Sequence, residues 1–148
     1  PICRIEVDLA PDATLLAAEA GVLGRAAMGE VVAEARFEDQ WRVRRDGALI
    51  YADALRIDGD IGALAGNPAA LNGGGAFASL CLIGPTDQVA PLLAPARAAI
   101  GDAGGASLVR PGVLAARLVA ENGFALRKAL IPALAVLRGR ALPALWTY

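Results

Sequence analysis

Carboxylates are the side chains of this sequence that are best suited to chemistry. Asp53, Asp58 and Asp60 could supply paired carboxylates for acid–base catalysis, or oxygen ligands for a hard metal ion. Asp53 and Asp58 are an odd number of positions apart, so on a single strand their side chains point to opposite faces. A turn formed by Asp58, Gly59 and Asp60 is the structural alternative.

Other common catalytic groups are scarce. Histidine is absent from the 148 residues, which excludes Ser-His-Asp and Cys-His catalysis and any histidine metal site. The two cysteines, Cys3 and Cys81, are too few for a disulfide framework or a four-thiolate zinc site. Both lie in apolar or alternating stretches, so we predict buried free thiols and a reducing, cytoplasmic compartment.

Charge is nearly balanced along the chain. The 14 basic and 15 acidic residues give a net charge of -1, which argues against nucleic acid as a partner, because neutralising phosphates needs an excess of Lys and Arg. Apolar residues make up 56% of the chain, which excludes intrinsic disorder. Charged residues, Asn or Pro interrupt each apolar run before it reaches the roughly 20 residues of a membrane span, so we expect no membrane partner.

Arginines gather on one predicted strand. Arg42, Arg44 and Arg45 form a small basic ribbon, and the strand predicted to return beside it carries Asp53 and Arg56. One interpretation is a solvated strand face with cross-strand pairs, and the other is a surface that docks a protein, because arginine is favoured at interfaces.

Hydropathy patterns predict a chain built mainly of strands. Apolar and polar residues alternate over 2–9 and from Glu30 to Val43, which is typical of half-buried strands. Asp46-Gly47 favours a type I′ hairpin turn, because both residues tolerate a positive φ. Residues 76–83 are apolar almost throughout, which predicts a strand buried on both faces. Further strands are predicted at 14–19, 48–57, 106–110 and 113–119, with a loop over 59–75.

Helical periodicity appears only late in the sequence. Residues 89–100 carry an apolar helical stripe, although Pro91 and Pro95 predict a late start or a kink. Asn122 can cap a last helix whose apolar stripe is Leu126, Leu130, Leu134 and Leu137. The predicted class is therefore α+β and mostly β, with short antiparallel or β-helix-like strands and two helices late in the chain.

Three blocks of sequence, taken in order, resemble the urease accessory protein UreD family, which is called UreH in some members. They are Gly24-Arg25-Ala26-Ala27-Met28-Gly29-Glu30, the stretch from Asp39 to Gly47, and the stretch from Tyr51 to Gly59. Residues 7–13, 125–130 and 142–146 are similar to the family's flanking regions, although a basic residue would be expected near Ala144. The resemblance covers nearly all of this chain and about the C-terminal half of a typical member. The chain also opens without methionine and inside a predicted strand, so we expect 1–148 to be the C-terminal part of a single UreD-like domain whose N-terminal half is absent.

The resemblance implies a cytoplasmic, non-enzymatic chaperone of urease maturation. Such a protein binds the urease apoprotein and recruits UreF and the GTPase UreG, so that nickel is inserted into the active site. It further implies a mostly β fold with two helices and a tunnel proposed as a nickel path. The candidate residues for the partner interface are Arg25, Glu30, Arg42, Arg44, Asp53 and Arg56.

Nickel itself is a difficult ligand for this sequence. It favours imidazole, thiolate or mixed nitrogen and oxygen ligands, whereas here histidine is absent and the thiols are predicted to be in the core. We therefore expect no tightly bound cofactor, and at most a weak, transient nickel relay at Glu30 and Asp53. Two alternatives remain open: a small carboxylate-dependent hydrolase domain that uses Glu30, Asp53 and Asp58, and a structural β-domain of a larger enzyme.

Overall fold

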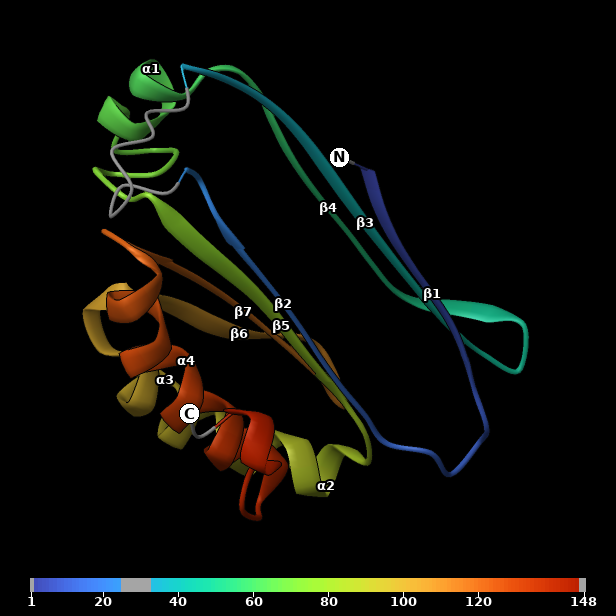
Figure 1. The fold of residues 1–148 in the computed structure, drawn as a ribbon. Coiled ribbons are helices and arrows are strands. Elements are labelled where there is room, and N and C mark those ends of the chain that lie inside the picture. The colour runs from blue at the N-terminus through green and yellow to red at the C-terminus, as the bar shows by residue number, and fades with distance from the viewer. Residues whose placement is uncertain (1, 25–32, 147–148) are drawn as a thin grey trace.

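Two β-sheets face each other, and helices cover the outer side of one of them (Figure 1). The computed structural model describes residues 2–24 and 33–146. This arrangement confirms the predicted α+β, mostly β class. Among the described residues, no helix combines the length and the apolar character needed to cross a lipid bilayer.

The first sheet has three strands in the order β1-β3-β4, namely β1 (Ile2–Leu9), β3 (Glu34–Arg45) and β4 (Ala48–Asp60). Strands β3 and β4 are antiparallel and are joined at Asp46 and Gly47. These two residues have φ values of 51° and 75°, as the predicted type I′ turn requires. Strand β1 pairs with β3 in parallel, which the sequence did not predict.

The second sheet has four antiparallel strands in the order β2-β5-β7-β6. They are β2 (Leu15–Val22), β5 (Ala76–Ile83), β6 (Gly104–Arg110) and β7 (Val113–Ala120). Every residue of β5 is buried, as predicted from its continuous apolar run. Its even-numbered residues pack against the helices, and most of its odd-numbered residues pack in the clusters between the two sheets.

The helices are α1 (Ile61–Gly66), α2 (Thr86–Val89), α3 (Leu93–Ile100) and α4 (Gly123–Arg138). The predicted break appears as a 3-10 turn over Ala90–Leu92, which contains Pro91 and separates α2 from α3. A second 3-10 turn, Gly101–Ala103, follows α3, and a third, Ala144–Trp146, lies near the chain end. The loop predicted over 59–75 is wrong at 61–66, where Asp60 caps the short helix α1 by accepting a hydrogen bond from the Ala63 amide.

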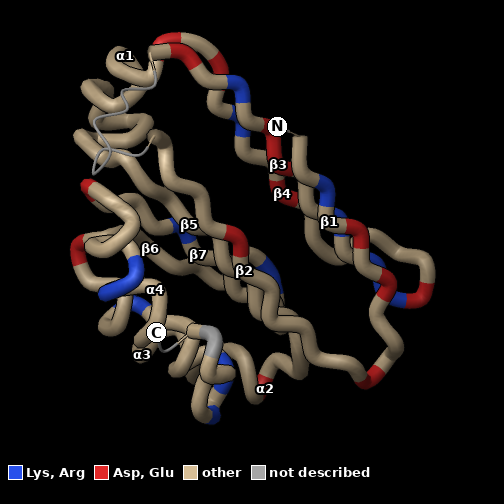
Figure 2. The backbone as a smooth tube through the Cα atoms, viewed as in Figure 1, with Lys and Arg blue, Asp and Glu red and all other residues tan. Residues whose placement is uncertain are grey.

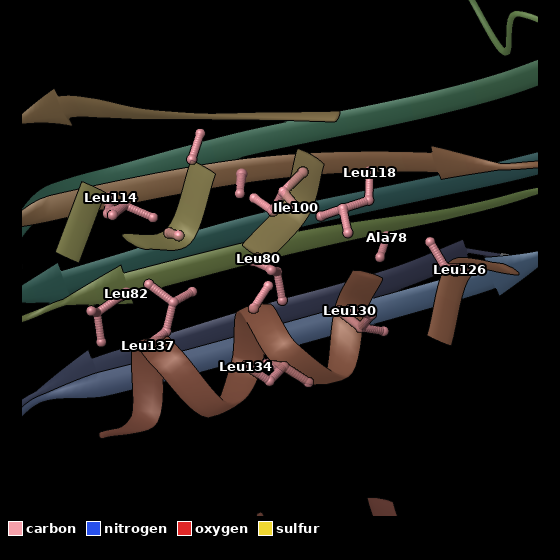
Figure 3. Packing of buried hydrophobic residues seen from close by; sticks show 14 of the residues in the cluster. Ala78, Leu80, Leu82, Ile100, Leu114, Leu118, Leu126, Leu130, Leu134 and Leu137 are labelled. Atoms are coloured by element: carbon pink, nitrogen blue, oxygen red, sulfur yellow. The ribbon is translucent and has the colours of Figure 1, made fainter. Parts of the chain in front are cut away.

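The largest apolar core lies between the second sheet and helices α3 and α4 (Figure 3). The predicted stripe of α4 is buried there, with Leu126 and Leu130 against residues of β5 and β7 such as Leu80 and Leu118. Burial of this apolar face is the main driving force for docking the helices on the second sheet. The helices cover one face of that sheet, and the first sheet covers the other.

Two smaller apolar clusters lie between the sheets. One is near the β3–β4 hairpin and is built around Trp41, Val43 and Tyr51. The other is near α1 and is built around Ile57, Ile61 and Phe77. The space between these clusters is where the polar side chains described below are found.

The cap of α4 gives the first testable prediction. The Asn122 side chain accepts a hydrogen bond of 2.9 Å from the Ala125 amide, as its position before the helix predicted. Asn122→Ala should lower the free energy of unfolding by about 1 kcal/mol, because the helix loses this cap. Urea denaturation measures the change, and Asn122→Asp is the matched control that should retain nearly all of the stability. Equal losses in the two variants would contradict a capping role.

Candidate functional site between the sheets

A row of polar side chains crosses the interior between the two apolar clusters, and we call it the polar layer. Its members are Cys3, Glu19, Asp39, Asp53, Ser79 and Arg117. Strand register aligns them: Cys3 is opposite Asp39 in the first sheet, and Ser79 is opposite both Glu19 and Arg117 in the second. The layer therefore draws on strands of both sheets.

An ion pair joins the sheets at one side of the polar layer. The Arg117 guanidinium on β7 donates to both carboxylate oxygens of Asp53 on β4, each at 2.7 Å. A second guanidinium nitrogen donates to the hydroxyl of Ser79 at 3.0 Å, and Ser79 is only 3% exposed. This two-pronged contact fixes the planar guanidinium and connects β4 to the second sheet.

Acidic groups and a thiol gather at the other side. One possible metal-ligand atom from each of Cys3, Glu19 and Asp39 lies within 4.8 Å of the other two. The indole nitrogen of Trp41 donates to Glu19 at 3.3 Å and so helps to hold that carboxylate in place. Among the described residues, no hydrogen-bond donor is available to Oδ1 of Asp39, whose residue is 3% exposed.

The electrostatics of this cluster follow from crowding. Burial, reinforced by the nearby Glu19 carboxylate, raises the pKa of Asp39 to about 6. The hydrogen bond to Glu19 raises the pKa of the Cys3 thiol, and burial adds to the effect. Burial also raises the pKa of the Cys81 thiol, to about 12, so Cys81 stays protonated at neutral pH. Two carboxylates so close together disfavour simultaneous ionisation unless a cation compensates them.

A cleft opens at the Arg117 side of the polar layer. Its volume is about 480 Å³, and it lies between β4 and strands β6 and β7. Asp53, Ser107 and Arg117 supply polar groups to its wall. Arg117 also lines two further clefts, on the side toward α1 and the turn that follows it. The Arg117–Asp53 ion pair therefore lies at the wall of several surface clefts.

The ion pair gives the second testable prediction. Arg117→Ala should lower the free energy of unfolding by about 1–2 kcal/mol, because Asp53 loses its charge-assisted hydrogen bonds while partial exposure of the pair screens the loss. Urea denaturation measures the loss of stability. In a double-mutant cycle, Asp53→Asn should lower the free energy of unfolding less in the Arg117→Ala background than in the wild type. The exposed Arg56–Asp58 pair is the matched control, and Arg56→Ala should have no resolvable effect. Additive losses for Arg117 and Asp53 would contradict the coupling.

The structure separates the carboxylates that the sequence offered as a pair. Asp53 faces the interior, whereas Asp58 is exposed on the outer face of the same strand, as the odd spacing predicted. There Asp58 pairs with Arg56, which lowers the pKa of Asp58 and raises that of Arg56. Strand β4 continues through Asp58, Gly59 and Asp60, so the turn predicted at 58–60 is wrong. Glu30, the third candidate of the hydrolase hypothesis, lies outside the described residues, as does Arg25.

The arginines of β3 lie on a face of mixed charge. Strand β1 places Glu6 opposite Arg42 and Asp8 opposite Arg44, whereas the β4 residue opposite Arg42 is Ala52. The cross-strand neighbours predicted on β4 are therefore replaced by acidic neighbours on β1. Acidic and basic residues occur on all three strands of this sheet (Figure 2).

Most of the polar layer was missed at the level of sequence. The prediction that both thiols are core residues holds for Cys81 but not for Cys3, which is only half-buried and faces Glu19. A signal was present for Asp39, because it continues the inward alternation of Phe37, Trp41 and Val43. A charged residue on an otherwise apolar inward face is a candidate functional residue.

These features define a class of protein: an α+β domain in which two facing sheets enclose a layer of acidic, thiol and guanidinium groups. The sequence profile of the family described as UreD urease accessory protein matches residues 3–147. The chain belongs to the UreD urease accessory protein family.

Relatives of the chain carry the same description. It is 47% identical over 145 residues to the urease accessory protein UreD of Rhizobium rhizogenes, and the match covers 97% of this chain and 52% of that protein. It is 45% identical over 147 residues to the UreD of Sinorhizobium medicae, with 97% and 53% covered. It is 44% identical over 148 residues to UreD 1 of Brucella abortus, with 97% and 52% covered. The chain thus spans about half the length of the curated relatives it matches.

Proposed function

We propose that the chain acts in the cytoplasm as a non-enzymatic scaffold of urease maturation. In this proposal it binds the urease apoprotein and recruits UreF and the GTPase UreG, so that nickel is inserted into the urease active site. Membership of the UreD family supports the role in urease maturation, since its relatives are described as urease accessory proteins.

The polar layer is the observation that carries the nickel part of the proposal. An interior row of Glu19, Asp39 and Asp53 is costly for a purely structural domain, because buried charges destabilise unless they are paired. Of these three, Asp53 alone has an ion-pair partner among the described residues that satisfies both of its oxygens. Oxygen ligands beside a thiol suit a divalent cation in transit, so we propose that nickel passes along this layer as cargo.

We propose that the outer face of the first sheet contacts a protein partner. Arg42 and Arg56 are exposed there, and Arg44 is half-exposed. Acidic residues of β1 lie beside Arg42 and Arg44, and Glu38 of β3 lies opposite Arg56 (Figure 2). Side chains of both signs on one flat face favour a partner with complementary charges, because such patterns fix the register of docking. Arg25 and Glu30 stay candidates for the same interface.

Co-expression tests the scaffold role. The tagged protein, expressed from its complete gene with the urease subunits and UreF, should co-elute with them on size exclusion. Reversing charge with Arg42→Glu and Arg44→Glu should weaken co-elution without unfolding the domain. Lys128→Glu on helix α4 is the matched control, since that residue lies over the exposed Phe124 ring on the helical side. Well-folded protein that elutes apart from urease and UreF would contradict the proposed function.

A further inference from the structure

We propose that an extended, acidic segment of a partner protein binds in the cleft between β4 and β6 and adds a strand to the edge of β6. This binding mode rests on the proposed function, because it describes how a partner in urease maturation is held. The strand order, the charges that line the cleft and the open space beside Gly105 support it.

Strands β4 and β6 are the last strands of their sheets on the side away from β1 and β2. Among the described residues, β4 pairs only with β3, and β6 pairs only with β7. A strand with one neighbour presents a row of backbone N–H and C=O groups without sheet partners, and an added strand uses these groups as its template. Residues 104–108 pair regularly with β7 and offer about 17 Å of such an edge.

A bulge near the end of β6 directs Arg110 across the cleft. The pairing with β7 shifts between Leu108 and Arg110, and the Arg110 guanidinium donates to the Ile50 carbonyl of β4 at 3.2 Å. Bulges commonly re-aim a side chain in this way. Since one arginine side chain spans the distance from β6 to β4, a segment in the cleft would contact both strands at once.

The charges in the cleft favour an acidic occupant. Two guanidinium groups, Arg110 and Arg117, and one carboxylate, Asp53, line it. Both oxygens of Asp53 are already bonded to Arg117. Arg110 has a carbonyl partner but, within the described part of the chain, no carboxylate partner. A carboxylate on the incoming segment would therefore bind Arg110 through a charge-assisted hydrogen bond.

Apolar side chains around the cleft fit a protein segment better than a small anion. Six large apolar side chains of the described residues are exposed, and three of them, Leu49, Leu108 and Val109, lie on β4 and β6. Val109 also lines the cleft, together with Ile50. An extended segment whose side chains alternate between apolar and polar would cover these residues while its backbone pairs with β6.

The open space beside Gly105 allows the cleft to be filled without disturbing the fold. Gly105 lines the cleft, and a Cβ atom added there would meet no other atom within 4 Å. Its φ lies outside the left-handed region, so a β-branched residue suits this strand position. Gly105→Val should therefore leave the domain folded and occupy the space of the incoming segment.

Hydrogen–deuterium exchange of the full-length protein, alone and in complex with the urease subunits and UreF, tests the added strand. The amides of 104–108 that point away from β7 should exchange freely in the protein alone and about tenfold more slowly in the complex. Gly105→Val and Arg110→Glu should each weaken co-elution about tenfold. Arg110→Lys keeps the charge and should retain most of the binding. Phe124→Ser, at an exposed position of helix α4, is the matched control that should change neither readout.

Slow exchange of these amides in the protein alone would overturn the proposal, because the edge would then be covered by the protein's own chain. Protection that appears without partners and increases with protein concentration would place a second copy in the cleft instead. A complex that forms while 104–108 exchange as in the free protein, or that tolerates both Gly105→Val and Arg110→Glu, removes the added strand and leaves the scaffold role. Failure of the folded wild type to join any complex removes both.

Discussion

Replacing Trp41 with alanine is expected to lower the free energy of unfolding by about 3–5 kcal/mol, the range for removing a large aromatic side chain from a core. Trp41 is 1% exposed and is among the largest fully buried side chains of the described chain. It packs with Val43 and Tyr51 between the two sheets, and its indole also donates to Glu19. Its loss would therefore both open a cavity and free a carboxylate of the polar layer. Urea denaturation measures the change.

Phe124→Ala provides the comparison for Trp41. Phe124 is 70% exposed, so its removal leaves no cavity, and stability should change by about 0.5 kcal/mol or less. Trp41→Phe should restore part of the packing but not the hydrogen bond to Glu19. A loss below about 1 kcal/mol for Trp41→Ala would contradict its place in the core between the sheets.

Asp39→Asn is expected to stabilise the protein at neutral pH, by about 2–3 kcal/mol when a chelator keeps metal away. The folded state raises the pKa of Asp39 from 3.8 to about 6. Between these two values the folded state holds a proton that the unfolded chain has released, so stability falls as the pH rises. Below about pH 4 the carboxyl is protonated in both states and this loss is absent. Asparagine cannot ionise and so avoids the loss.

Urea denaturation of the wild type and Asp39→Asn between pH 4 and pH 8 measures this difference. The two proteins should have similar stability near pH 4 and should diverge up to about pH 6, after which the gap stays constant. Glu6→Asn on the exposed face of β1 is the matched control, and its stability should follow the wild type. A stability difference that stays constant from pH 4 to pH 8 would contradict a raised pKa of Asp39. So would a wild type whose stability increases relative to that of the variant as the pH rises.

Local signals in the sequence predicted much of the fold. The Asp46-Gly47 turn, the doubly buried strand 76–83 and the helix capped by Asn122 each depend on residues close together in the chain. The amphipathic stripe of α4 likewise follows from helical spacing alone. The short helix α1 was missed because Gly and Ala there also suit a loop, and because the capping side chain of Asp60 was assigned to a turn.

The pairing of strands could not be predicted in the same way. Strands β1 and β3 are parallel neighbours, although β2 lies between them in the sequence and joins the other sheet. That choice depends on long-range packing, which also decides which strands bring polar residues together. The contact of Cys3 with Glu19 and Asp39 arises from this topology. Local sequence contains no information on that pairing, and for this reason the alternating pattern around Cys3 predicted a core thiol. The Arg117–Asp53 ion pair, which joins residues 64 positions apart, was missed for the same reason.

The nickel content of urease tests the central claim most directly. Urease would be purified from cells that express its subunits with UreF and UreG, with and without this protein expressed from its complete gene, at limiting nickel. We predict that urease made with the protein carries several times more nickel per active site than urease made without it. Equal nickel content in the two preparations would contradict a role in urease maturation.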